Sequence, residues 1–157
     1  MGAFLTPLQL EYLDGRRWKV LSPFEYHLGA PEGVEVISIP IGFITDFASI
    51  PRALWSLLPP TGGYGKAAVV HDWLYQVRIV ADTSKTPVGL RLVERGEADA
   101  LLREGMEVLG VSRATRWTIF TGVRIGGGGT WRRYRNQERL PPCDTPVLAQ
   151  LLQKDPP

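Results

Sequence analysis

The stretch LQLEYLDGRRWKVLSPFEYHL, residues 8–28, predicts the fold of the first part of the chain. Its two apolar-rich runs flank the dipeptide Asp14-Gly15, and an Asp-Gly pair between two such runs is a strong signal for a β-hairpin. The run VEVISIP, residues 34–40, alternates apolar and polar side chains as a half-buried strand does. Residues 1–41 are therefore predicted to form antiparallel strands.

After Pro40 the strand pattern gives way to signals for helices. Ser49 is a good N-cap, and the Pro59-Pro60 pair ends the short helix that Ser49 would begin. The later helices are predicted from apolar stripes at helical spacing or from a capping residue at one end. The chain thus carries four predicted helices, over about residues 49–58, 66–79, 92–109 and 112–125.

The remaining segments are predicted to be irregular. Residues 80–90 are interpreted as a loop, and the four glycines of residues 126–129 are expected to stop the last helix. The tail is rich in proline and has no periodicity, so we expect it to be extended or held by a partner. The prediction is an α+β protein with N-terminal antiparallel hairpins or a sheet and then three to four packed helices. It assigns a single domain to residues 1–135 and an extended C-terminal tail to residues 136–157.

Composition excludes several classes of protein. A chain of 157 residues fits one domain with a real core. The single cysteine, Cys143, cannot form an internal disulfide, which excludes a disulfide scaffold. The first residues lack the basic and apolar regions of a signal peptide, and no apolar run approaches the roughly 20 residues that span a bilayer. We therefore expect a soluble protein that is not secreted by a signal peptide.

Charge is unevenly distributed along the chain. Residues 1–110 have a net charge of −3, and residues 111–157 have a net charge of +5. In the basic part, arginines share a predicted helix face with Trp117 and Phe120, and WRRYR follows at residues 131–135. Arginine among aromatic residues can bind nucleic acid, or can form an ordinary solvated face. Because no DNA-binding motif is present, the solvated face is favoured and nucleic acid is not expected as a partner.

The segment HDWLY, residues 71–75, places titratable residues in an otherwise apolar helix. At about 100° per residue, His71 and Tyr75 share one stripe and Asp72 lies beside it. Two interpretations stay open. These side chains satisfy buried partners and fix the packing, or they line a site as an imidazole base or metal ligand beside a carboxylate.

Asp99, in the sequence RGEAD, is a second acid of interest. Its simplest interpretation is a surface ion pair with Arg95 or Arg103, each four residues away on the same helix. If the second and third predicted helices pack antiparallel, Asp99 could instead reach His71. Enzymes use such a carboxylate to fix the tautomer and the orientation of an imidazole.

A third polar cluster lies in TDFASIPR, residues 45–52. Asp46 and Ser49 could simply satisfy amides of the turn and of the helix end. In a functional interpretation, Asp46 is a metal ligand on a tight turn and Ser49 is a conceivable nucleophile.

The motifs GFITDFASIPRALW, PPTGGYGKAAVVHDWLY and RGEAD together resemble DUF1353, a family of uncharacterised phage and prophage proteins. The resemblance covers about residues 8–135 and implies an origin in a bacteriophage or an integrated prophage. The segment around residues 80–90 and the tail depart from the family pattern, so nothing is carried over there. The positions that match the family motifs are Asp46, Ser49, Arg52, His71, Asp72, Tyr75 and Asp99.

The arrangement H-D-x-x-Y on a helix, behind a glycine-rich loop and opposite an aspartate on a second helix, is also similar to secreted phospholipase A2. In that enzyme the histidine is the base, the next aspartate binds calcium, and the aspartate of the antiparallel helix orients the histidine. This chain lacks the disulfides and the full calcium-loop motif of that family. The similarity is one of local geometry alone.

The leading hypothesis is a phage-encoded, metal-assisted hydrolase acting on the bacterial cell envelope or on a phosphoester. In it His71 is the general base or a metal ligand, and Asp99 orients His71. Carboxylates bind a divalent cation, zinc or calcium, and two hydroxyls are hydrogen-bonding neighbours. The carboxylates that bind the cation are those of Asp46 and Asp72. The neighbouring hydroxyls are those of Tyr75 and Ser49.

The alternative hypothesis is a non-enzymatic structural or assembly component of the phage virion, in its tail. The polar cluster would then stabilise the fold, and the basic C-terminal region would contact other virion proteins. Under either hypothesis the expected location is the host cytoplasm during assembly, the virion, or both. The sequence leaves open whether the protein is an enzyme.

Overall fold

The computed structural model describes residues 1–15, 17–47 and 63–136. The predicted short helix with Ser49 and Arg52, and the proline-rich tail, lie outside these ranges. The strands of the described part are β1 (Ala3–Phe4), β2 (Leu10–Asp14), β3 (Arg17–Val20), β4 (Phe24–His27), β5 (Glu35–Ile39), β6 (Ile44–Thr45), β7 (Ile79–Asp82) and β8 (Gly89–Leu92). The helices are α1 (Gly65–Gln76), α2 (Arg95–Val108) and α3 (Arg113–Arg135).

The described part has an α+β arrangement, with N-terminal antiparallel sheets followed by three helices, as predicted. The larger sheet has five strands in the order β1-β4-β5-β7-β8, and every neighbouring pair is antiparallel. Phe24 lies opposite Ile39 in this sheet and Tyr26 lies opposite Ile37, and all four side chains are buried. These strands therefore contribute much of the apolar core.

The smaller sheet contains the predicted Asp14-Gly15 hairpin. Strands β2 and β3 are antiparallel across that turn, and Gly15 has a φ of 51°, which glycine adopts more readily than other residues. Strand β6 then pairs with β3 and places Thr45 opposite Trp18. The hairpin prediction is confirmed, and the added strand β6 carries Thr45 to a fully buried position beside helix α1.

The prediction that residues 80–90 form a loop holds for residues 83–88 and is wrong at both ends. Residues on either side of the tip form the hairpin of β7 and β8, and β7 completes the sheet by pairing with β5. Each of these strands has only four residues, so the local pattern is short. Their stability depends on pairing with β5, more than 40 residues earlier in the chain, and a local sequence pattern does not reveal such a partner.

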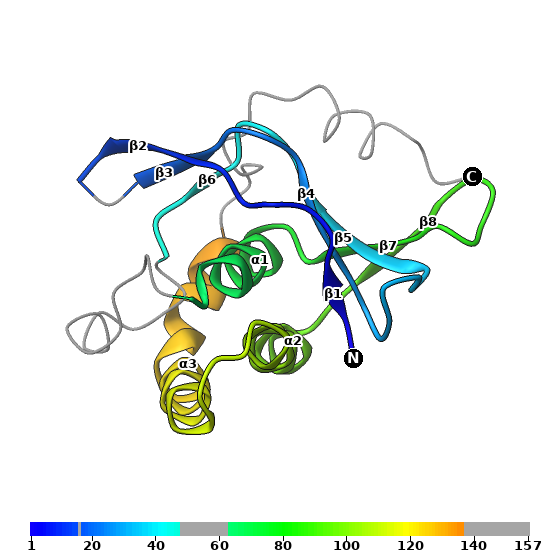
Figure 1. The fold of residues 1–157 in the computed structure, drawn as a ribbon. Helices are drawn as coiled ribbons and strands as arrows, with labels where there is room; N and C mark the ends of the chain where they lie inside the picture. The colour runs from blue at the N-terminus through cyan, green and yellow to red at the C-terminus, as the bar shows by residue number, and fades with distance from the viewer. Residues whose placement is uncertain (16, 48–62, 137–157) are drawn as a thin grey trace.

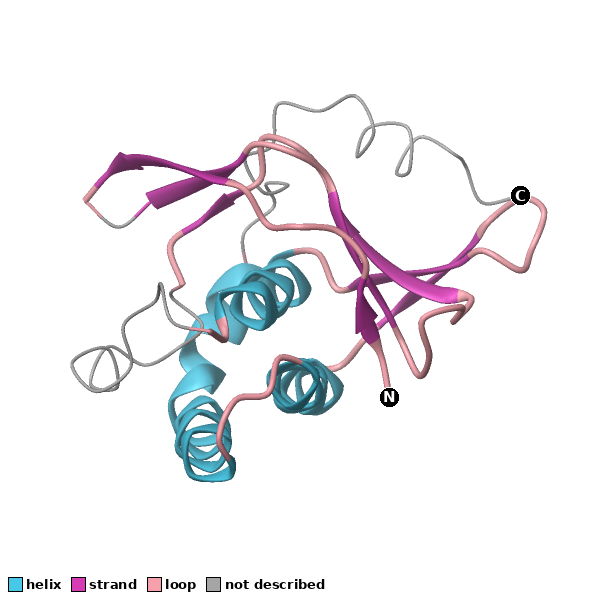
Figure 2. Ribbon diagram, in the orientation of Figure 1, coloured by secondary structure: helices cyan, strands magenta, loops and turns pink. Residues whose placement is uncertain are grey.

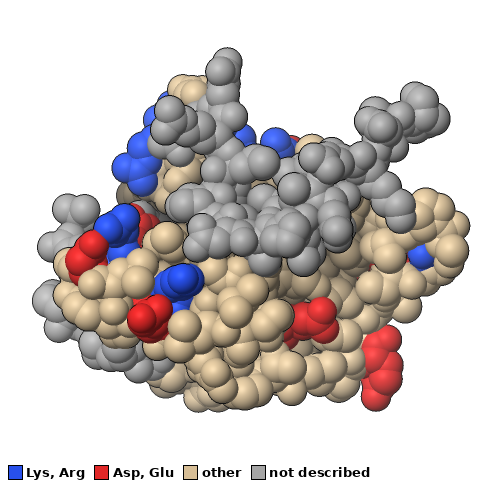
Figure 3. Space-filling view, turned by 90° about the horizontal axis from the view of Figure 1, so that it is seen from above, with Lys and Arg blue, Asp and Glu red and all other residues tan. Residues whose placement is uncertain are grey.

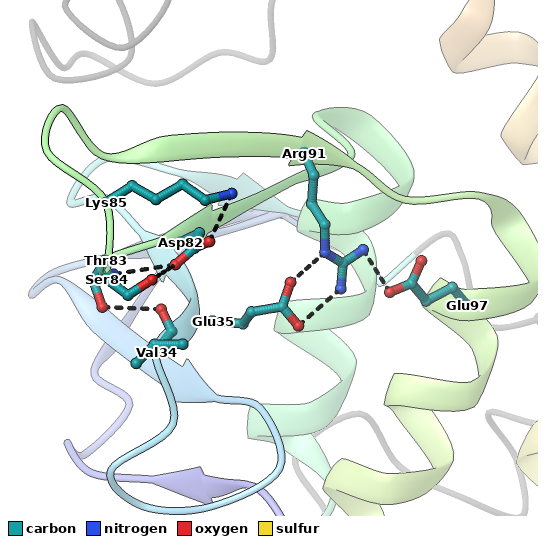
Figure 4. Close-up of polar contacts among 8 residues, drawn as sticks. All are labelled: Val34, Glu35, Asp82, Thr83, Ser84, Lys85, Arg91 and Glu97. Carbon is teal, nitrogen blue, oxygen red and sulfur yellow. Dashed lines mark hydrogen bonds and ion pairs between the residues drawn. The ribbon is translucent and has the colours of Figure 1, made fainter.

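One arginine of this hairpin links three elements (Figure 4). Arg91, on β8, contacts Glu35 of β5 through Nε, and its Nη1 lies 2.7 Å from Oε1 of Glu97 on α2. The hydrogen bond to Glu35 has the largest effect on the Arg91 guanidinium and raises its pKa, whereas burial lowers it. The edge of the sheet is thereby tied to the first turns of α2.

The helices gather on one side of the sheets, as Figure 2 shows. Helices α1 and α2 lie next to the strands, and α3 lies on these two helices. Helix α1 contacts β5 and α2 contacts β1, whereas α3 packs against α1 and α2. A β-carbon at Gly105 of α2 would lie 3.1 Å from the β-carbon of Ala67, near the start of α1. Toward the other end of α1, His71 contacts Asp99 near the start of α2. Helices α1 and α2 are therefore antiparallel.

Helix α3 begins as predicted but does not end as predicted. Ser112 is its N-cap and accepts a hydrogen bond from the Thr115 amide. The glycines of residues 126–129 do not stop the helix, which continues to Arg135. Glycine costs about 0.8–1.0 kcal/mol relative to alanine inside a helix, so packing overrides propensity here. A β-carbon at Gly127 would lie 2.5 Å from the Tyr75 hydroxyl, so glycine lets α3 approach α1 closely.

Candidate functional site

A buried hydrogen-bond network joins α1 to α2. His71 and Tyr75 lie one turn apart on α1, and both face Asp99 on α2. The Nε2 atom of His71 is 2.9 Å from Oδ1 of Asp99, and the Tyr75 hydroxyl donates to the same oxygen at 2.7 Å. All three side chains are fully buried. The contact between His71 and Asp99 that antiparallel packing predicts is confirmed.

The other oxygen of Asp99 is bound from the third helix. Nη1 of Arg124 on α3 is 2.9 Å from Oδ2 of Asp99. The interpretation of Asp99 as a surface residue paired with Arg95 or Arg103 is wrong, because the carboxylate faces inward between the helices. Arg124 was not predicted as a site residue. Its position on a face with Trp117 and Phe120 gave no sign of this contact, since α3 and α2 meet only in the fold.

Asp99 is ionised, and this fixes the hydrogen-bonding role of His71. Burial alone would raise the pKa of the Asp99 carboxyl. Hydrogen bonds from His71, Tyr75 and Arg124 outweigh burial and hold that pKa below its ordinary value. An ionised carboxylate only accepts hydrogen bonds, so His71 Nε2 is the donor. Burial, followed by the hydrogen bond to Asp99, raises the pKa of Tyr75, which therefore stays a hydroxyl donor near neutral pH.

Asp72 belongs to a second group of polar residues. It is fully buried, and its Oδ2 accepts a hydrogen bond from the Thr45 hydroxyl on β6. Burial and, after it, the negative charges of Asp72 and Asp46 together raise the pKa of Tyr134 on α3 to about 12. Both carboxylates therefore act electrostatically on Tyr134. The common metal-binding role of Asp46 and Asp72 stays a prediction.

The side chains of the described residues suit the two predicted metals, zinc and calcium, unequally. No three His, Cys, Asp or Glu side chains of the described ranges form a group that could hold a metal ion. Catalytic zinc takes three protein ligands from such residues, so these side chains do not fit zinc. Calcium takes oxygen ligands, including backbone carbonyls and water, and the two carboxylates beside Tyr134 are chemically compatible with it.

The end of α3 covers the network (Figure 1, where its last turns lie next to α1). Trp131 packs edge-on against Tyr75, with ring centroids 5.1 Å apart. The Arg135 guanidinium donates to the carbonyl oxygens of Tyr75 and Gln76 at the end of α1, and it lies over the Trp131 ring at 4.8 Å from the centroid. The sequence signal for this cover is the run WRRYR, which we interpreted as a solvated face.

Arginines of α2 and of α3 make contacts between these two helices. Arg116 pairs with Glu107 of α2 at 2.8 Å, and Phe120 receives Arg103 of α2 over its ring. Figure 3 views the molecule from the side of β2 and β3, away from α3, and on that face too basic and acidic side chains lie next to one another at several points. The arginine-aromatic pattern thus reflects contacts between α2 and α3 at these positions.

We expect the free energy of unfolding to fall as the pH drops below about 4. The folded-state pKa of Asp99 is depressed, so its stabilising effect is present above the unfolded-state pKa and is lost as the pH falls through the folded-state pKa. Urea unfolding between pH 3 and 7 measures the effect. Asp99→Asn should be less stable at neutral pH and should lose less stability on acidification. Equal acid losses in the two proteins would contradict this assignment.

The fold and the network define a class: a small α+β protein whose three helices meet at one buried aspartate that accepts from a histidine and a tyrosine. The family model described as "Protein of unknown function (DUF1353)" matches residues 18–123. The match covers more than half of the chain, and the chain belongs to this family. Comparisons with curated proteins and with solved structures gave no match. Among the described residues, no helix has the length and apolar character needed to cross a membrane.

Proposed function

We propose that the protein is a hydrolase in which His71 is the general base. The observation that carries this proposal is the shared acceptor: Asp99 Oδ1 receives hydrogen bonds from both His71 Nε2 and the Tyr75 hydroxyl. A general base needs a fixed tautomer and a fixed ring orientation, and a buried carboxylate supplies both. The similarity of this local geometry to secreted phospholipase A2 supports the same role.

The chemistry follows from the tautomer. With the proton on Nε2 donated to Asp99, the lone pair of His71 lies on Nδ1. In the proposed reaction Nδ1 takes a proton from water while the water oxygen bonds to the electrophilic carbon or phosphorus of an ester. The ester bond then breaks, and the proton passes from Nδ1 to the leaving oxygen. Asp99 stabilises the imidazolium between these steps, and Tyr75 and Arg124 hold the carboxylate in place.

Asp46 and Asp72 would hold a calcium ion in this proposal. The ion would supply positive charge that stabilises the anion developing on the substrate. Tyr134 lies near both carboxylates, and its raised pKa keeps it a hydroxyl. We further propose that the substrate is an ester or phosphoester of the bacterial cell envelope and that the protein acts for a phage in the host cytoplasm or in the virion.

A second candidate function, a structural or assembly component of the virion tail, is supported by a different observation. His71, Asp72 and Asp99 are fully buried, and Asp99 has hydrogen bonds at both oxygens. A network that only stabilises the fold would have these properties. In this case the basic C-terminal region would contact other virion proteins. The two candidates differ in what a conservative change at His71 would do.

We expect His71→Gln to reduce hydrolysis by about 10²–10⁴-fold, because glutamine can bond to Asp99 but cannot act as a base. The assay uses chromogenic carboxylic esters, chromogenic phosphodiesters and phospholipid vesicles, each with calcium and with a chelator. His27→Gln is the matched control, since His27 is the only other histidine and lies on β4. Hydrolysis that is equal in the two variants, or no hydrolysis by the wild type together with a lower melting temperature of His71→Gln, would favour the structural function.

A further inference from the structure

The four glycines of residues 126–129 are unusual because they lie inside a helix. Packing explains Gly127, whose β-carbon would meet the Tyr75 hydroxyl. It does not explain Gly129, where a β-carbon would meet nothing within 4 Å, and both Gly126 and Gly129 are exposed. Glycine favours the unwound state of a helix more than alanine does. Helix α3 is therefore weakest over these residues for a reason other than close packing.

The residues beyond the glycines pack on Tyr75 and on the end of α1, next to the buried network. Trp131 packs on Tyr75, Tyr134 lies near Asp72 and Asp46, and Arg135 donates to carbonyl oxygens at the end of α1. Residues 130–135 form one turn and a half of helix, and we call them the cover. The glycines separate this cover from the part of α3 that holds Arg124 against Asp99. The weak segment thus lies between the cover and the anchored body of the helix.

The cover is held mainly by contacts that can be broken separately from the core. Trp131 and Tyr134 are only partly buried and pack at the margin of the apolar core. Trp131 also carries the guanidinium of Arg78 at 5.5 Å and that of Arg135 at 4.8 Å from its centroid. These two like charges lie close together, and, after burial, the charge of Arg78 is the next cause that lowers the pKa of Arg135. Their repulsion acts against the closed arrangement, and Glu94, which pairs with Arg78, offsets part of it.

We propose that residues 126–129 are a hinge and that the cover swings on it to admit substrate to His71. The inference rests on the proposed function, because a fully buried His71 and Asp99 can act on a substrate only after a segment moves. Hinges are a few positions that absorb large changes of backbone angle, and glycine absorbs them most easily. The cover is the described segment that lies on Tyr75 and also adjoins the carboxylates proposed to bind calcium.

The test replaces a hinge glycine without changing any contact. Gly129→Ala adds a methyl group in open space and favours the helical state by about fivefold, as expected from helix propensities. We expect about fivefold slower hydrogen exchange of the amides of residues 130–135. Modification of His71 by diethyl pyrocarbonate should slow by a similar factor. Modification of His27, followed in the same digest by mass spectrometry, should not change.

Gly96→Ala is the matched control. Gly96 lies in the first turn of α2, is exposed, and its added β-carbon would meet only the end of the Arg124 side chain at 3.8 Å. The change should stabilise α2 to a similar extent and leave both rates at the wild-type value. Equal rates for His71 in the wild type and Gly129→Ala, or equal slowing by Gly96→Ala, would overturn the hinge.

The exchange and modification rates do not depend on catalysis, so the two proposals can fail separately. Slower modification of His71 in Gly129→Ala together with slower hydrolysis supports both the hinge and the hydrolase. Slower modification in a protein that hydrolyses none of the assayed esters supports the hinge and counts against the proposed function. Hydrolysis that requires His71 but is accompanied by unchanged modification rates supports the hydrolase and overturns the hinge.

Discussion

Asp99→Asn is expected to lower kcat for hydrolysis by about 10²–10⁴-fold and to change KM little. The amide has the shape of the carboxylate but can donate to Nε2 of His71, which favours the tautomer with its proton on Nδ1. The base would then carry its lone pair on the wrong nitrogen. Because the substrate does not contact Asp99 in the proposed mechanism, binding should be retained. Steady-state kinetics with the best ester from the assay measure both constants.

Tyr75→Phe is the comparison for Asp99→Asn. It removes one hydrogen bond to Asp99 Oδ1 and keeps the charge and the bond to His71. We expect a loss of kcat of about tenfold, since a hydrogen bond to an ionised carboxylate contributes about 1.5 kcal/mol at the lower end of its range. If Tyr75→Phe lost as much kcat as Asp99→Asn at equal stability, the tautomer would not be what Asp99 controls.

Gly127→Leu is expected to destabilise the fold by about 3 kcal/mol, the upper part of the range for overpacking. A β-carbon at Gly127 alone would lie 2.5 Å from the Tyr75 hydroxyl and 3.3 Å from its ring carbon Cζ. Helix α3 would have to move away from α1, and the contact between Trp131 and Tyr75 would open. The free energy of unfolding from urea denaturation, with Tm as a second measure, reports the change.

Gly129→Leu is the matched control, because it is the same substitution two residues further along the same helix. The side chain at position 129 would enter open space, so we expect stability to be unchanged or slightly raised by the better helix propensity of leucine. Equal destabilisation by the two substitutions would mean that glycine is required at both positions for the helix backbone itself. The close approach of Gly127 to Tyr75 would then not explain the effect.

Local sequence signals predicted the elements whose causes are local. The Asp14-Gly15 turn, the strand β5 and the Ser112 cap each depend on a few neighbouring residues, and the structure contains all three. The expected alternation of burial along β5 is incomplete, because the adjacent Val36 and Ile37 are both buried. The ends of the loop predicted over residues 80–90 and the helix end predicted at the glycines are wrong. In both places the deciding partner is distant in sequence: Val36 for β7, and Tyr75 for Gly127. A window of neighbouring residues does not contain these partners.

The candidate site could be predicted in part for the same reason. Helical spacing placed His71 and Tyr75 on one stripe, and an assumption of antiparallel helices brought Asp99 to them. The contact of Asp99 with Arg124 could not be predicted, because it depends on how a third helix lies across the first two. The catalytic and metal-binding roles of Asp46, His71, Asp72, Tyr75 and Asp99 remain predictions, as does that of Ser49, which lies outside the described residues.

The single carboxylate of Asp99 receives donors from α1 and α3 while belonging to α2. Selection on this protein therefore acts on a set of positions and not on separate ones. Loss of the acid at position 99 would remove the shared acceptor of an imidazole, a phenol and a guanidinium at once, so we expect changes at positions 71, 75 and 124 to accompany it. The four positions should be inherited together or replaced together, which links the evolutionary fate of three helices to one side chain.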